Sequence, residues 1–222
     1  QNAWRRHGEA AKDAFEKAVA AAPGEFPREF RMIEDTSGDL IGEIIRAARV
    51  ADLIVAPQDD DKTGDPALEG LAERLVMESG RPVLITPYAS AAMSAGMHPM
   101  VAWNGAREAS RSAFDALPIL QAADKTTILS VNPDQSSRSG EGPIPGAELA
   151  TVLDRHGVKS EASSTFANDG SIGEILLNRA SDLGCDLIVM GAYGHPKIQE
   201  IFLGGATRKI LRTMTIPVLA SH

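Results

Sequence analysis

One layout occurs twice in this chain, and it limits the possible folds more than any other feature of the sequence. The stretches SGDLIGEIIRAARVADLIVAP (37–57) and DGSIGEILLNRASDLGCDLIVMG (169–191) both read as a turn, an amphipathic helix and a buried DLIV strand. Farther along, RPVLITPY (81–88) is matched by IPVLASH (216–222). A repeat of this size is a whole domain rather than a solenoid unit, so we expect two related domains.

The later copy is the more complete of the two. Its apolar runs predict strands at 99–103, 125–131, 185–191 and 216–221, and an alternating pattern predicts a strand at 158–166. Helices are predicted between these strands, at 106–120, 147–157, 171–184 and 206–214. Strands that alternate with helices imply right-handed crossovers, so we expect an α/β fold with an open, mostly parallel sheet covered on both faces.

The earlier copy starts at the second helix of this scheme. It supplies a helix at 1–24, a strand at 28–35, a helix from residue 40, a strand at 52–57, a helix at 67–80 and a strand at 81–88. We therefore expect an incomplete first domain over 1–90 (the first copy), a linker at 91–97 and a second domain over 98–222 (the second copy). The apolar final strand of each copy is a plausible edge for pairing between domains or subunits.

Charge and cysteine content exclude several kinds of partner. A net charge of −8 argues against general binding to nucleic acid or to an anionic membrane, because both are polyanionic. Cys185 is the only cysteine and lies in an apolar strand, so we expect a buried packing residue and no disulfide. With no long apolar run and no leader pattern, the sequence indicates a cytoplasmic protein.

The segment MGAYGHPKIQEIFLGGATRKIL (190–211) follows a predicted strand at the end where parallel sheets bind ligands. We expect Gly191 and Gly194 to make a sharp turn at positive φ and to leave backbone amides open. Gly204 and Gly205 precede a helix whose amino terminus favours a phosphate. The alternative is that these glycines only shape the connection, with His195 facing solvent rather than a phosphate.

DLIVMGAYG, then nine residues and GGATRKILRTMTIPVL, resembles the universal stress protein family, whose G-x2-G-x9-G-[ST] signature follows the fourth strand. The resemblance covers nearly the whole chain and is to the tandem-domain type. It implies the open α/β sheet of universal stress proteins and of the adenine-nucleotide alpha hydrolase-like group, in two tandem copies. It also implies pseudo-twofold pairing of the two domains, or a homodimer.

The resemblance further implies a nucleotide site in the second copy. In nucleotide-binding members, an Asp after the first strand meets ribose or adenine, the end of the second strand frames the base, and the glycine loop holds the triphosphate, often with Mg²⁺. The set carried over to this sequence is Asn104, Val131, Gly191, Gly194, His195, Gly204, Gly205 and Ala206. Asn104 lacks the charge of the Asp, and Gly205 lacks the hydroxyl of the Ser or Thr.

Acidic residues stand elsewhere in the chain. In the first copy, Asp59 and its neighbours 60, 61 and 65 replace the glycine loop, so we expect that copy to repel phosphate. These carboxylates fit a divalent cation or, more commonly, a solvated loop. Glu108 and Asp115 read as helix-surface residues with no acid–base spacing. No catalytic residue is therefore predicted.

Two functions remain open. The first is a stress-response protein whose second copy binds ATP or a related adenine nucleotide as a signal, with little or no catalysis. The second is a dimeric interaction protein of the same family that has lost nucleotide binding. An adenylyl-transferring enzyme is a third reading, but the sequence lacks the histidine-rich motif that such chemistry requires.

Overall fold

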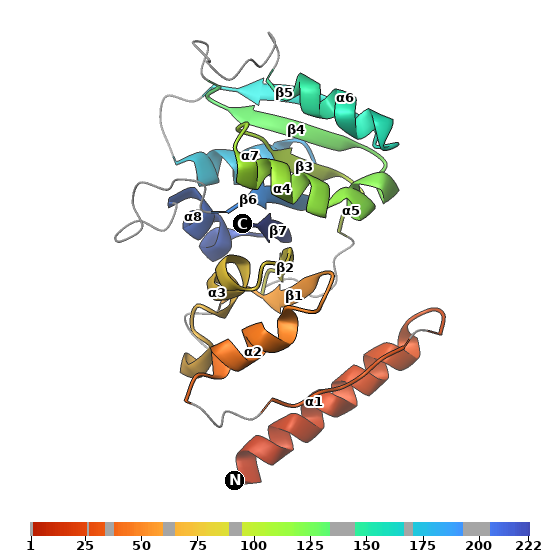
Figure 1. Cartoon of the computed structure of the whole chain (residues 1–222), viewed down its shortest axis with the longest axis vertical. Coiled ribbons are helices and arrows are strands. Elements are labelled where there is room, and N and C mark those ends of the chain that lie inside the picture. The colour runs from red at the N-terminus through yellow and green to blue at the C-terminus, as the bar shows by residue number, and fades with distance from the viewer. Residues whose placement is uncertain are drawn as a thin grey trace. The chain divides into compact units, whose positions relative to one another are not determined.

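A computed structural model describes residues 2–25, 27–33, 38–59, 65–88, 95–133, 145–166, 171–192 and 205–222 of the chain (Figure 1). The chain divides into two compact units, Gln1–Ile44 and Ile45–His222. Each unit is described by itself below. The domain boundaries predicted from the sequence at residues 90 and 98 stay a prediction.

The first unit is built on helix α1 (Asn2–Ala21). The ring of Phe15 on α1 lies 5.6 Å, centroid to centroid, from the ring of Phe30, which fixes the returning chain against the helix. The strand predicted at 28–35 is wrong for residues 28–33, which form no strand. The reason is that a strand needs a partner. Its counterpart in the second copy pairs with a neighbouring strand, whereas residues 28–33 pair with none of the strands that the structure describes.

The second unit contains a seven-stranded sheet in the order β1-β2-β7-β6-β3-β4-β5 (Figure 1). Its strands are β1 (Ile54–Pro57), β2 (Val83–Thr86), β3 (Pro99–Ala102), β4 (Thr126–Val131), β5 (Ser160–Thr165), β6 (Leu187–Gly191) and β7 (Val218–Ser221). All neighbouring strands are parallel except β2 and β7, which are antiparallel. The predicted α/β class is confirmed, and so is pairing between the final strands of the two copies.

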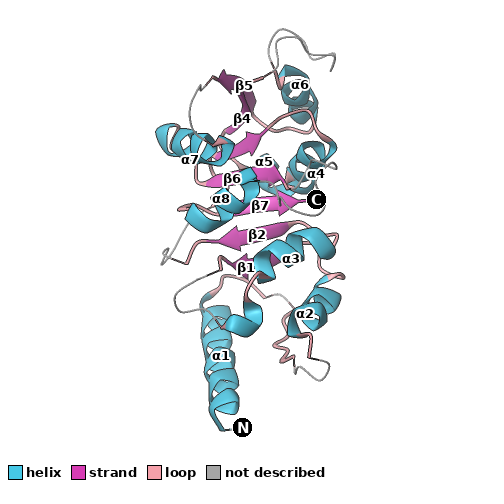
Figure 2. Cartoon of the chain, turned by 90° about the vertical axis from the view of Figure 1, so that its left-hand side faces the viewer, coloured by secondary structure: helices cyan, strands magenta, loops and turns pink. Residues whose placement is uncertain are grey.

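Helices cover both faces of this sheet (Figure 2). They are α2 (Leu40–Ala48, which begins in the first unit), the 3₁₀ turn η1 (Pro66–Leu68), α3 (Leu71–Glu78), α4 (Arg107–Asp115), α5 (Leu117–Ala122), α6 (Ala147–Arg155), α7 (Ile172–Asp182) and α8 (Gly205–Thr213). Right-handed crossovers that run in opposite directions along the sheet place their helices on opposite faces. Accordingly α4, α5 and α6 lie on one face, and α7 and α8 on the other (Figure 2).

Two helices that the sequence predicts as continuous are interrupted. The helix predicted at 106–120 is α4 followed by α5, with a break at Ala116. Pro118 causes this break, because it has no amide hydrogen to donate to the preceding turn and its ring crowds that turn. The helix predicted at 67–80 is η1 followed by α3, separated at Gly70, whose φ of 76° ends the first turn.

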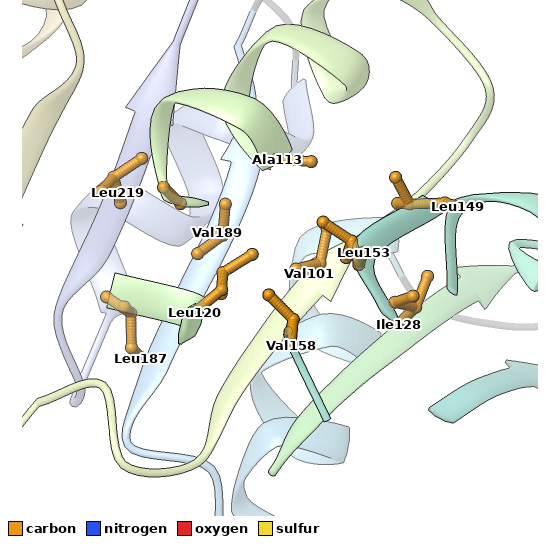
Figure 3. Close-up of a cluster of buried hydrophobic side chains, with 11 residues drawn as sticks. Val101, Ala113, Leu120, Ile128, Leu149, Leu153, Val158, Leu187, Val189 and Leu219 are labelled. Atoms are coloured by element: carbon orange, nitrogen blue, oxygen red, sulfur yellow. The ribbon is translucent and has the colours of Figure 1, made fainter. Parts of the chain in front are cut away.

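The main core of the second unit lies between the sheet and α4, α5 and α6 (Figure 3). It consists of Val101, Ala113, Ala116, Leu120, Ile128, Leu149, Leu153, Val158, Leu187, Val189 and Leu219. Complete burial of one such Val, Leu or Ile side chain contributes about 1.5–3 kcal/mol, so this cluster holds α4 and α6 rigidly over β3, β4 and β6. The candidate site lies at the carboxyl ends of these same strands.

Cys185 is buried just before β6, as predicted for a packing residue. Burial raises the pKa of its thiol, and the neighbouring Asp186 carboxylate raises that pKa further, so the thiol stays protonated and unreactive. Among the helices in the part of the chain that the structure describes, none has the length and apolar content needed to cross a bilayer.

Candidate functional site

The strand order of the second copy reverses at the boundary between β3 and β6. From β3 the chain crosses through α4 to β4, whereas β6 lies on the other side of β3 and is reached from β5 through α7. At such a point the connections from the two strands lead to opposite faces of the sheet. A crevice therefore remains between the connections at the carboxyl ends of the two strands. In open parallel sheets this is where ligands bind.

The sheet register brings three of the predicted residues to this edge. Ala102 on β3 is level with Leu129 on β4 and with Met190 on β6. Asn104 comes two positions after Ala102, Val131 two after Leu129, and Gly191 one after Met190. These three residues therefore lie side by side where their strands end. The sheet therefore brings these three predicted residues to one edge, and their role in binding stays a prediction.

Asn104 is exposed and shapes the turn that leads from β3 into α4. Its side-chain Oδ1 accepts a hydrogen bond from the backbone N–H of Ala106 at 3.1 Å, and Gly105 completes the turn with a φ of 71°. Because the oxygen is engaged in the turn, the group that this side chain offers to a ligand is its Nδ2 amide, a hydrogen-bond donor.

Gly191 does not do what the sequence predicted. Its φ lies outside the left-handed region, so the expected positive-φ turn is wrong. Instead, a Cβ at this position would lie 2.4 Å from the carbonyl carbon of Glu108 and 2.5 Å from the nitrogen of Ala109. Gly191 is required because the first turn of α4 packs directly onto the end of β6.

The phosphate-binding half of the prediction falls largely on residues that the structure does not describe. Gly194, His195 and Gly204 lie outside the described residues. Gly205 and Ala206 are described, and they begin α8, a helix with no acidic residue in its first turn. The backbone amides of a first helical turn have no partner within the helix, so this end carries a partial positive charge.

Two cationic side chains of α8, those of Arg208 and Lys209, form ion pairs with other helices. Nε of Arg208 lies 3.7 Å from the carboxylate of Glu73 on α3, and Nζ of Lys209 lies 2.8 Å from the carboxylate of Glu174 on α7. Any anion at the start of α8 would therefore be held by backbone amides rather than by these two side chains.

Glu108 was predicted to lie on the helix surface, and the structure corrects this. Its side chain is only 6% exposed, and it forms an ion pair with Arg107, which is 83% exposed. Burial raises the pKa of the Glu108 carboxyl, but hydrogen bonds from Arg107 and from its own backbone, with the charges of Arg107 and His222, lower it below its ordinary value of 4.5. Glu108 therefore carries its charge beside the end of β6.

His222, the residue after β7, lies at the same edge of the sheet. One of its ring nitrogens, Nδ1, lies 3.0 Å from the carbonyl oxygen of Ala192, the residue that follows β6. The sequence carries no signal for this contact, which depends on the pairing of β6 with β7, or for the burial of Glu108, which depends on how closely α4 approaches the sheet. Within the described stretches, no three His, Cys, Asp or Glu side chains are grouped as metal ligands. Asp60 and Asp61 lie outside those stretches.

The order of the strands, the open edge and the helix that follows β6 agree with one protein family. A profile of the Universal stress protein family matches residues 100–222, more than half of the chain. The chain belongs to the universal stress protein family. The match covers the whole second copy from β3 onward, so the resemblance predicted from the sequence is confirmed there.

Among known members, the chain is 27% identical over 150 residues to Universal stress protein Slr1230 from Synechocystis sp.. This match covers 66% of the chain and 49% of that protein, so the chain spans about half the length of this curated relative.

Two solved structures share the fold at low sequence identity. A universal stress protein from Archaeoglobus fulgidus DSM 4304 matches with a TM-score of 0.68 and 16% identity, over 100% of this chain and 79% of that one. The functionally unknown protein PA1789 from Pseudomonas aeruginosa PAO1 matches with a TM-score of 0.59 and 15% identity, over 96% of this chain and 77% of that one. Matches over nearly the whole chain fit an arrangement of two tandem copies.

Proposed function

We propose that the second copy binds ATP or a related adenine nucleotide, with Mg²⁺ on its phosphates, and that occupancy acts as a signal in a stress response. The observation that carries this proposal is the convergence of Asn104, Val131 and Gly191 at the switch point of the sheet. The start of α8 follows β6 in the chain and supplies free backbone amides. Family membership gives the same expectation for this edge.

Each residue has a distinct part in the proposed site. The Nδ2 amide of Asn104 donates to an acceptor on the ribose or base, and the backbone at Val131 borders the base. Phosphates lie at the amino terminus of α8, against the amides of Gly205 and Ala206. Gly194, His195 and Gly204 complete the proposed set. No side-chain ligand for Mg²⁺ is proposed, so the ion would be held by phosphate oxygens and water.

The proposed role is binding rather than catalysis. Glu108, a buried carboxylate beside the end of β6, is held by Arg107 and stays ionised, which removes it as a proton donor near neutral pH. We expect slow hydrolysis of ATP or none. Phosphate release measured alongside binding tests this expectation.

Calorimetric titration with Mg-ATP tests the site, using two substitutions at one position. Gly205 is exposed, and among the described residues no heavy atom lies within 4 Å of where its Cβ would be, so Gly205→Asp and Gly205→Ala should both fold. An Asp at a helix start interacts favourably with the helix dipole but repels a phosphate. We expect one site per chain in the wild type and in Gly205→Ala, and a loss of at least about tenfold in affinity in Gly205→Asp.

The absence of heat and of any thermal shift at millimolar Mg-ATP would refute nucleotide binding. A specific observation supports the alternative, an interaction protein of the same family. Packing explains Gly191 completely, and the Oδ1 of Asn104 is engaged in its own turn. Two of the predicted site residues therefore have structural roles that need no ligand.

A further inference from the structure

The joint between β2 and β7 is nearly symmetric. Val83, Leu84 and Ile85 pair with Ala220, Leu219 and Val218 in antiparallel register. In the repeat, Leu84 and Leu219 occupy the same position of the Pro-Val-Leu motif, so each faces its own counterpart. A pairing in which a residue meets its counterpart has a twofold relation, and here the local axis passes by the Leu84–Leu219 pair.

Backbone hydrogen bonds show that the copies are equivalent around this joint. Ile54 N donates to Pro82 O at 3.0 Å, and Ile188 N donates to Pro217 O at 3.0 Å. The same correspondence relates Gln58 N to Thr86 O, at 2.8 Å, and Ala192 N to Ser221 O, at 2.9 Å. Gln58 and Ala192 are therefore counterparts at the ends of β1 and β6.

Helices α3 and α8 are also counterparts. Each ends in a matching backbone bond, from Ser79 N to Leu75 O at 3.1 Å and from Met214 N to Ile210 O at 2.8 Å. Counting back along the two helices from these bonds makes Glu73 and Arg208 counterparts as well. We call β1, β2 and α3 of the first copy, with β6, β7 and α8 of the second, the pairing face.

The counterparts Glu73 and Arg208 meet across this face with opposite charges. Nε of Arg208 lies 3.7 Å from Oε1 of Glu73, and the two side chains are 43% and 24% exposed. If two first copies paired in this way, Glu73 would meet Glu73. If two second copies paired, Arg208 would meet Arg208. Like charges at such a separation repel one another.

Gln58 adds a second contact that two second copies could not make. It is buried, and its Nε2 donates to the carbonyl oxygen of Leu211 at 2.8 Å, while its Oε1 accepts from Tyr88 N at 3.3 Å. Leu211 lies in the last turn of α8, where carbonyl oxygens have no partner within the helix. The counterpart of Gln58 is Ala192, which has no group to donate, so pairing of two second copies would lose this bond.

We infer that the pairing face is matched to unlike copies. Glu73–Arg208 favours a first copy against a second copy and disfavours both like pairings, and Gln58–Leu211 further disfavours the pairing of two second copies. The partner that fits the β2–α3 surface is thus a second-copy domain, with a cation on its α8 and a free carbonyl at the end of that helix. Because the chain fills this surface with its own second copy, homodimers do not use it.

Hydrogen exchange of the whole chain tests the charge pair at the joint itself. We expect Glu73→Arg and Arg208→Glu each to speed amide exchange in β2 and β7 by about two- to fivefold, and the double reversal to restore the wild-type rate. Lys209→Glu is the matched control. It reverses the neighbouring charge on α8, whose partner Glu174 belongs to the same copy, so exchange in β2 should not change.

Equal exchange in all four variants, or a double reversal that is worse than either single one, would overturn the inference. Light scattering of the same samples gives an independent measurement. We expect the wild type and both single reversals to have the same mass. A wild-type dimer that falls to one chain in either single reversal would show that the face joins separate chains, which would also overturn the inference.

Discussion

Replacing Gly191 with Ala should destabilise the protein, and the structure sets the size of the effect. The added methyl would lie 2.4 Å from the carbonyl carbon of Glu108, 2.5 Å from the nitrogen of Ala109 and 2.8 Å from the Cβ of Glu108. Carbon atoms in ordinary contact are about 3.5–4.0 Å apart, so the backbone of α4 must retreat from β6 by roughly 1 Å.

Such a retreat is costly because none of the three atoms belongs to the flexible end of a side chain. Helix α4 also places Ala109 and Ala113 in contact with the sheet, and both are buried. Overpacking of this kind costs typically about 1–3 kcal/mol, and we expect the upper half of that range in the free energy of unfolding.

Urea denaturation followed by circular dichroism measures this loss. Gly205→Ala is the control, since its Cβ would meet nothing within 4 Å and its φ is not left-handed. That variant should be unchanged or up to about 1 kcal/mol more stable. If Gly191→Ala is as stable as the wild type with an unchanged denaturant slope, packing against α4 does not explain Gly191. The hypothesis that this glycine serves a phosphate-binding loop would then be favoured again.

Three further outcomes are expected. Asn104→Asp keeps one oxygen to accept from the Ala106 N–H and offers a second oxygen to a hydroxyl of the nucleotide. Calorimetry should therefore show the affinity for Mg-ATP rising by up to about tenfold, and weaker binding would contradict this role of residue 104. Because the pKa of Glu108 is lowered in the folded state, its charge stabilises the fold above about pH 4.5, and this stabilisation is lost as pH falls through the folded-state pKa. The free energy of unfolding of Glu108→Gln should therefore depend less on pH below about 4.5 than that of the wild type. Ser171→Ala removes the capping box of α7 and should cost about 1 kcal/mol in urea, whereas the exposed Ser181→Ala should be neutral.

Apolar runs bounded by turn residues predicted the strands of the second unit other than β5. The polar strand β5 was predicted from the alternation of its sequence. All five strands predicted for the second copy are present, as are the two predicted at 52–57 and 81–88. Over residues 28–33, the strand predicted at 28–35 failed because its pattern is local, whereas strand formation depends on a partner. The breaks at Ala116 and Gly70 had signals in the sequence, Pro118 and Gly70 itself, but the amphipathic pattern continued across both positions.

The candidate site was predictable only in part. Placing Asn104, Val131 and Gly191 at one edge follows from strand order and register, which a resemblance to a family supplies. The reason for Gly191 does not follow, because a glycine that opens an amide and one that admits a helix look the same in sequence. Burial of Glu108 was missed for the same reason, since it depends on how closely α4 approaches β6.

Differences between counterpart positions suggest that the two copies have diverged toward separate tasks. Pro57 on β1 pairs with Thr86 as Gly191 on β6 pairs with Ser221, so Pro57 is the counterpart of Gly191. A proline carries the Cβ that Gly191 must lack, so no helix can approach β1 as closely as α4 approaches β6. At the next position the first copy has the functional side chain. Gln58 donates a buried hydrogen bond to α8, whereas its counterpart Ala192 has no side-chain group that could donate to α3. The switch-point geometry thus belongs to the second copy, whereas Gln58 and Glu73 of the first copy contribute polar contacts to α8.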